Sequence, residues 1–115
     1  MSSDFPGKGL HRDLALSRVG GDPELLKEIA ALFIEDYPKV LAEIRAATAR
    51  GDALGVEHAA HGLKGAVANF GAQAAVEAAF QLEQMGRAGD LRRAREALDT
   101  LARALDALHP ELEGL

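Results

Sequence analysis

The sequence of 115 residues contains no cysteine and no tryptophan, and its aromatic side chains are one tyrosine and four phenylalanines. Without cysteine, the chain has no disulfide, no thiolate nucleophile and no cysteine-ligated zinc site. With so few aromatic residues, its core must be built mainly from Leu, Ala, Val and Ile. Together with the many Glu and Arg residues, this composition favours helices over sheets.

Other absences narrow the functional class. The formal net charge is −5 and there is no block of basic residues, which argues against nucleic-acid binding. No apolar run approaches the length of about 18 residues that a membrane span requires, and the N-terminus lacks the charged-then-apolar pattern of a signal peptide. We therefore expect a single soluble domain in the cytoplasm, without direct membrane contact.

The chain divides into a short leader and one helical domain. Residues 1–9, rich in Ser, Gly and Pro, are predicted to be a flexible leader, and residues 10–115 to form a single bundle domain. Apolar spacing predicts a short helix over residues 10–19. It also predicts a long helix over residues 23–50 that kinks or loosens just before Pro38.

Aspartates mark where the second and third helices begin. Asp22 is the expected N-cap of the second helix, and Asp52 that of the third, which extends to Phe70. A fourth helix is predicted over residues 72–85. Its inward-facing residues are expected to be Ala75, Val76, Ala79, Phe80 and Leu82.

The last helix carries the most regular apolar pattern. Gly86 and Gly89 are predicted to bracket the preceding turn, and Asp90 to cap the helix. The apolar residues that follow its repeat are Leu91, Ala94, Leu98, Leu101, Leu105, Leu108 and Leu112. Such a seam and the short connections predict an all-α fold, an up-and-down antiparallel four-helix bundle with a short extra N-terminal helix.

The predicted third helix contains an unusual stretch at its centre. It reads Ala60-His61-Gly62-Leu63-Lys64-Gly65-Ala66. Glycine inside a helix costs about 0.5–1 kcal/mol relative to alanine. At about 100° per residue, His61 lies roughly 150° from the centre of the apolar stripe, and Gly65 lies roughly opposite that stripe. Helix packing therefore does not explain Gly65, whereas a need for exposed backbone beside His61 does.

These residues suit a phosphorylated histidine better than a buried or metal-bound one. An exposed imidazole is a nucleophile at neutral pH, Lys64 can contact phosphate oxygens, and the missing side chain at Gly65 admits a partner. The simplest alternative is that His61 is an ordinary surface residue. A metal site with His58 and Glu57 lacks a firm third and fourth ligand and is not the His-Glu-x-x-His pattern of zinc peptidases, so no metal is expected.

Residues 60–72 resemble the signature of histidine-containing phosphotransfer (HPt) domains of two-component phosphorelays. That signature is Ala-His-x-Leu-Lys-Gly-Ala/Ser, three loose positions, an apolar residue and Gly. Here it reads Ala60-His61-Gly62-Leu63-Lys64-Gly65-Ala66-Val67-Ala68-Asn69-Phe70-Gly71-Ala72. The resemblance extends along most of the chain, including the Leu82-Glu83 pair. One departure is Gly62, which stands where the family commonly has Ser or Thr.

The positions that match the family imply roles for individual residues. His61 matches the phosphoacceptor, Lys64 the lysine that helps hold the phosphoryl group, and Gly65 the small residue that gives a receiver access. Glu83 matches a Glu or Gln that in some members bonds the other imidazole nitrogen and orients the ring. The alternative for Glu83 is a surface residue. Arg87 is a further candidate for docking or phosphate contact. The expected docking face comprises Gly65, Ala68, Gly62, Glu57 and His58.

The resemblance implies a phosphocarrier rather than an enzyme with a catalytic site of its own. It would accept a phosphoryl group on His61 from a receiver aspartate and pass it to another receiver aspartate. Its partners would be response-regulator receiver domains or a hybrid sensor histidine kinase, with Mg²⁺ on the receiver and no cofactor on this chain, which is expected to be a monomer. The alternatives are a receiver-binding module without transfer, and the phosphoacceptor domain of a chemotaxis-type kinase phosphorylated by another chain.

Overall fold

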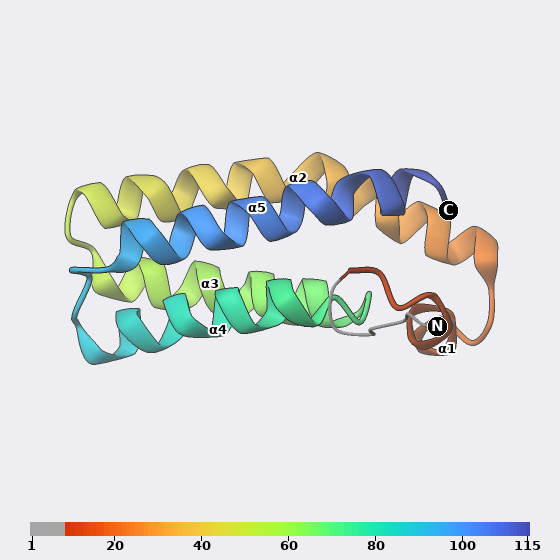
Figure 1. Cartoon of the computed structure of the whole chain (residues 1–115), viewed down its shortest axis with the longest axis horizontal. Helices are drawn as coiled ribbons and strands as arrows, with labels where there is room; N and C mark the ends of the chain where they lie inside the picture. The colour runs from red at the N-terminus through yellow and green to blue at the C-terminus, as the bar shows by residue number, and fades with distance from the viewer. Residues whose placement is uncertain (1–8) are drawn as a thin grey trace.

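The computed structural model describes residues 9–115, so the leader predicted over residues 1–9 lies outside it apart from Gly9. Within the described range the chain is all-α. Its helices are α1 (Arg12–Arg18), α2 (Pro23–Ala49), α3 (Ala53–Ala68), α4 (Gln73–Ala88) and α5 (Ala94–Glu113). Helices α2 to α5 run alternately up and down as one antiparallel bundle, and α1 lies at one end of it (Figure 1). The predicted four-helix bundle with a short N-terminal helix is confirmed.

Short polar side chains fix where two of the long helices begin. Oδ1 of Asp22 accepts hydrogen bonds from the backbone N–H groups of Glu24 and Leu25, at 3.0 and 3.2 Å. Oδ1 of Asp52 accepts one from the N–H of Gly55 at 2.9 Å. These bonds satisfy N–H groups that have no partner within their own helix. Both predicted N-caps are therefore present.

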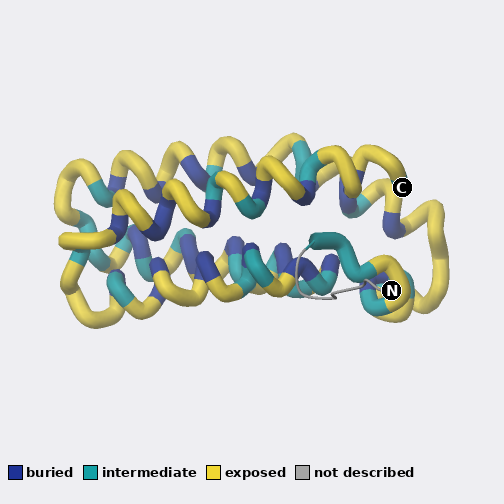
Figure 2. Tube along the Cα trace, viewed as in Figure 1, coloured by how far each residue is buried: buried dark blue, intermediate teal, exposed yellow. Residues whose placement is uncertain are grey.

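The core is one apolar seam between the four long helices, and buried positions recur along each of them (Figure 2). On α5 the predicted apolar residues from Ala94 to Leu112 are all buried, whereas Leu91, which precedes the helix, is partly exposed. Burying one leucine side chain contributes about 1.5–3 kcal/mol. On α3 the residues buried in the same seam are Val56, Ala60, Leu63 and Val67. This packing turns His61 outward.

The structure corrects the predicted connection between α4 and α5. Gly86 lies inside α4 and is buried, so Gly89 alone, with a φ of +71°, supplies the left-handed residue that ends the helix. Asp90 does not cap α5. Its Oδ1 accepts from the backbone N–H of Arg92 at 3.2 Å within a turn, and the helix begins later, at Ala94. The spacing of apolar residues after Asp90 does not reveal the turn that precedes Ala94.

Phe80 also differs from the sequence predictions. The prediction that Phe80 faces inward is wrong, because its side chain is 43% exposed. It lies at the edge of the α3–α4 seam, where the ammonium group of Lys64 is 4.9 Å from the ring centre, a cation–π distance. Small alanine residues fill the inward face of α4 instead. Helix α2 continues through Pro38 as one element from Pro23 to Ala49.

Gly86 determines how closely α3 and α4 approach. A Cβ atom at this position would lie 2.6 Å from the backbone nitrogen of Glu57 and 2.7 Å from the carbonyl oxygen of Ala53. Both atoms belong to the backbone of α3, which yields only if the whole helix moves. The missing side chain therefore allows the two backbones to touch. Because of this contact, Glu83, one turn earlier on α4, comes within reach of side chains on α3.

We predict that Gly86→Ala destabilises the bundle even though alanine favours helix. The conflict with the α3 backbone should exceed the helix-propensity gain of about 1 kcal/mol, giving a net loss of about 1–2 kcal/mol in the free energy of unfolding. Urea unfolding followed by circular dichroism measures this change.

Gly65→Ala is the matched control, because no heavy atom of the described chain outside the local helix lies within 4 Å of a Cβ built there. This variant should gain up to about 1 kcal/mol. A Gly86→Ala chain as stable as the parent would contradict the role given to Gly86.

Candidate functional site

His61 lies near the middle of α3, on the face turned away from the core. Its side chain is 67% exposed. The two nearest glycines, Gly62 and Gly65, add no bulk, and a Cβ at either position would meet no other part of the described chain within 4 Å. The imidazole therefore projects from a low surface, in the direction that its angular position on the helix predicts. A partner as large as a protein can reach it.

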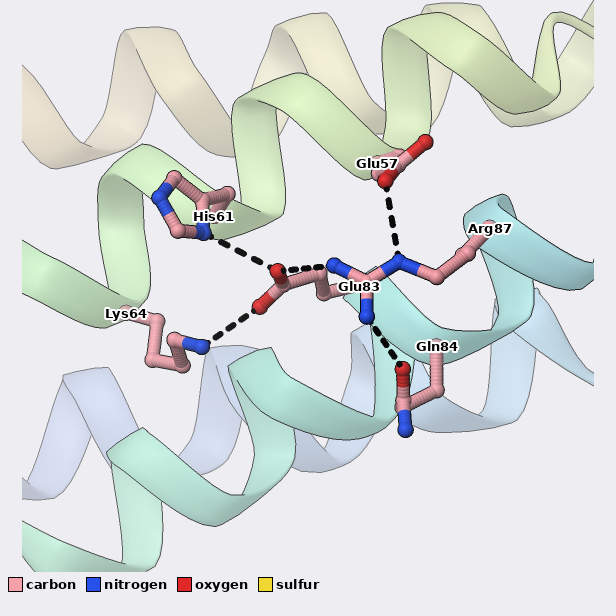
Figure 3. Close-up of polar contacts among 6 residues, drawn as sticks. All are labelled: Glu57, His61, Lys64, Glu83, Gln84 and Arg87. Atoms are coloured by element: carbon pink, nitrogen blue, oxygen red, sulfur yellow. Dashed lines mark hydrogen bonds and ion pairs between the residues drawn. The ribbon is translucent and has the colours of Figure 1, made fainter.

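A buried carboxylate from α4 holds the imidazole ring. Glu83 is 2% exposed, and its Oε2 lies 2.9 Å from Nδ1 of His61 (Figure 3). Because an ionised carboxylate can only accept hydrogen bonds, Nδ1 carries the proton and donates the hydrogen bond to Glu83. The neutral ring then has its lone pair on Nε2. The structure thus brings together the two residues that the family resemblance pairs, and the alternative of a surface Glu83 is wrong.

Two cations contact the same carboxylate. Nζ of Lys64 lies 2.7 Å from Oε1 of Glu83, and Nη2 of Arg87 donates to Oε2 at 3.0 Å. The contact with Lys64, and then the donation from His61, hold the pKa of Glu83 below its ordinary value of 4.5, against the opposing effect of burial. Glu83 is therefore ionised at neutral pH. Its charge is compensated within the protein, as a buried charge requires.

Arg87 joins α4 to α3. Its Nε donates to Oε2 of Glu57 on α3 at 3.1 Å, and its Nη1 donates to Oε1 of Gln84 at 3.3 Å. Glu57, which the sequence predicts on the docking face, is thus engaged with Arg87 across the helix seam. Sequence reasoning missed Gln84. The signal that could have found it is its spacing of three residues from Arg87 on one helix.

The other predicted docking residues lie along α3 on both sides of His61. His58 and Gly62 line a groove between α2 and α3. The α2 wall of this groove includes Leu32, whose side chain is 66% exposed and which sequence reasoning also missed. Ala68 is partly buried in the last turn of α3. An open groove with apolar residues and the acidic side chains of Glu35, Asp36 and Glu43 in its wall therefore reaches Gly62, the residue next to His61.

Two other features, a metal site and a membrane-spanning helix, are absent from residues 9–115. In that range no three His, Asp or Glu side chains gather as a metal ion would require. Glu57 pairs with Arg87, while His58 lines the groove on the α2 side. No helix in the same range is both long enough and apolar enough to cross a membrane.

Comparison with known proteins also points to histidine phosphotransfer domains. A family model described as the Hpt domain matches residues 28–111, which is most of the chain. Among solved structures, the chain is similar to the crystal structure of histidine-containing phosphotransfer protein B from Pseudomonas aeruginosa PAO1. The TM-score is 0.84, the sequence identity is 25%, and the alignment covers 91% of each chain. No curated protein sequence matches this chain significantly.

We predict that Glu83→Gln lowers stability at neutral pH and removes part of its pH dependence. Glutamine keeps the shape but loses the charge that both cations contact, so the free energy of unfolding should fall by about 1–3 kcal/mol. Because the pKa of Glu83 is below 4.5 in the folded chain, its stabilising effect is complete above the unfolded-state pKa and is lost as pH falls through the folded-state pKa. The difference between parent and variant should therefore shrink in acid, below pH 4.5.

Urea unfolding of both chains from neutral to acidic pH measures this difference. Glu96→Gln is the matched control, because Glu96 pairs with Arg93 on the surface and its side chain is 70% exposed. Its removal should change stability little at any pH. If Glu83→Gln is as stable as the parent at neutral pH, the buried carboxylate does not hold the site together.

Proposed function

This chain belongs to the Hpt domain family, which performs histidine phosphotransfer in phosphorelays, and we propose that His61 is its phosphoacceptor. The atom that accepts the phosphoryl group is Nε2. The observation that carries the proposal is the hydrogen bond from Nδ1 to the buried Glu83, because it places the lone pair on the exposed nitrogen. In two other histidines, Nδ1 has a partner that is not a carboxylate. Nδ1 of His11 accepts a hydrogen bond from the backbone N–H of Leu14 at a helix N-terminus, and Nδ1 of His109 lies 2.7 Å from the hydroxyl of Tyr37.

The transfer is a displacement at phosphorus. Nε2 attacks the phosphoryl group carried by a receiver aspartate, so that the Nε2–P bond forms while the P–O bond to the aspartate breaks. The aspartate leaves as a carboxylate. The ring keeps its Nδ1 proton and becomes positively charged, and the charge-assisted hydrogen bond to Glu83 stabilises that charge as it develops. Passing the group to a second receiver aspartate reverses the same bond changes.

The negative charge of the phosphoryl oxygens is neutralised from both partners. Lys64 brings a point charge on a flexible stem to the Nε2 side. The receiver supplies Mg²⁺ and the acidic pocket that holds it, because the nearby carboxylates of Glu57 and Glu83 are already paired with cations. The chain is thus a phosphocarrier that binds no cofactor and has no catalytic site of its own. It acts as a monomer, in the cytoplasm, with receiver domains or a kinase.

The receiver docks on the outer face of α3. Gly65 and Ala68 have little or no side chain, so they leave room on this face for a partner. Gly62 and His58 connect the face to the α2–α3 groove, which they line. Leu32 offers the kind of apolar surface that a protein partner buries at the centre of an interface. This placement also gives Gly62 a use, which is to leave the groove open beside His61.

We predict that a receiver phosphorylated with radioactive phosphate labels this chain in the presence of Mg²⁺. The label should be stable to base and labile to acid, as expected of a phosphoramidate bond, and absent from His61→Gln. His109→Gln, at the far end of α5, is the matched control and should keep the label. Tight receiver binding without label would leave only a receiver-binding module. Labelling by a kinase with ATP, but never by a receiver, would instead indicate the phosphoacceptor domain of a chemotaxis-type kinase.

We predict that Gly65→Leu separates docking from chemistry. The added side chain stands where a receiver must approach, so transfer from the receiver should slow by at least about tenfold. Labelling of His61 by the small donor phosphoramidate should remain nearly unchanged, because a small molecule needs no docking face. Gly65→Ala, which adds one carbon, should lose much less. Receiver transfer at the parent rate in Gly65→Leu would contradict the proposed docking face.

A further inference from the structure

Glu83 contacts its two cations through different oxygens and in different ways. Nζ of Lys64 lies 2.7 Å from Oε1, yet Oε1 has no well-directed hydrogen bond to any residue that the structure describes. Oε2 accepts directed hydrogen bonds from both His61 and Arg87. The Lys64 contact is therefore an ion pair held by charge, whereas the Arg87 contact also has a fixed direction.

The two cations also differ in how firmly they are held. The guanidinium group of Arg87 donates to Glu57, Glu83 and Gln84, which belong to two helices (Figure 3). The ammonium group of Lys64 pairs with Glu83 and lies over the ring of Phe80. A planar guanidinium suits several fixed acceptors at once, while a lysine ammonium pivots on its four-carbon stem with little loss. Lys64 is thus the cation that can move.

Phosphotransfer makes a competing demand on Lys64. To contact a phosphoryl group on His61, its ammonium must shift from Oε1 toward the new oxygens. Glu83 remains buried and ionised during this shift, and a buried charge without a counter-ion is strongly unfavourable. Arg87 stays on Oε2, so the carboxylate keeps one cation throughout.

We infer that Arg87 is the resident counter-ion of Glu83 and that Lys64 is the exchangeable one, an inference that rests on the proposed function of His61. Arg87 is then a positioning residue. It releases Lys64 for the phosphoryl group and keeps Glu83 in place against Nδ1 of His61. Glu57 holds Arg87 to α3, which prevents the guanidinium from following Lys64 toward the phosphate.

The inference predicts that the effect of removing Lys64 depends on Arg87. In the parent chain, Lys64→Ala should slow transfer from the phosphorylated receiver to His61 by about tenfold. In Arg87→Gln, Lys64 is the sole remaining counter-ion and stays on Glu83. Transfer is then slow already, and adding Lys64→Ala should slow it by less than about twofold more. Arg92→Gln is the matched background in which the full effect persists, since Arg92 is 85% exposed and pairs with Asp90 before α5.

Two further variants separate this role from a loss of structure. Arg87→Lys keeps a cation beside Glu83 and should restore most of the Lys64 effect. If Arg87→Gln does not fold, Glu57→Gln replaces it as the background in which Lys64→Ala is compared. It frees Arg87 to move toward the phosphate, so it should also reduce the Lys64 effect.

A spectroscopic measurement tests the same exchange without a receiver. When phosphoramidate labels His61, the NMR signals of the Lys64 ε-methylene group should shift in the parent and remain unchanged in Arg87→Gln. Equal effects of Lys64→Ala in the parent and in the Arg87→Gln or Glu57→Gln backgrounds would overturn the inference while leaving His61 as the phosphoacceptor. A parent chain that takes no label from either donor would overturn both.

Discussion

A carboxylate with almost no exposure to water lies in the seam between α3 and α4, and the site is arranged around its charge. Because an unpaired ion in such a place is strongly unfavourable, the fold has to supply partners for it. That requirement keeps Lys64 and Arg87 beside Glu83 and leaves Oε2 to accept a hydrogen bond from Nδ1 of His61. The direction of the nucleophilic nitrogen therefore follows from the same pairing that stabilises the helix interface.

The seam also explains why glycines inside neighbouring helices have opposite effects. Gly86 faces the backbone of α3 at contact distance, whereas Gly62 and Gly65 face open space in the described part of the chain. At Gly86 the missing Cβ allows two helices to touch, which brings Glu83 within reach of His61. At Gly65 the missing Cβ weakens the helix and leaves the imidazole accessible. One helix pair thus uses the same residue type for packing on its inner side and for access on its outer side.

The helices, two of the caps and the outward position of His61 could be predicted from sequence, because they depend on local spacing and on residues such as Asp22 and Asp52. The burial of Glu83 could not. A glutamate at the edge of an apolar stripe is buried or exposed according to how closely the next helix approaches, and that distance depends on Gly86, which local patterns assign to a turn. Phe80 is exposed for a related reason, since alanines bring α4 so close that a large ring stays at the rim.

Charge balance connects the resting site to the transfer it is proposed to perform. The formal charges of Glu57, Glu83, Lys64 and Arg87 cancel, so the imidazole lies beside a group of zero net charge. A phosphoryl group on Nε2 adds negative charge on the outer side of the ring, while the retained Nδ1 proton makes the ring positive beside Glu83. The lysine, which has the fewest directed contacts, can follow the new negative charge. The positive ring and Arg87 then remain to balance Glu83, so the charges redistribute by the movement of one side chain and the helix interface stays intact.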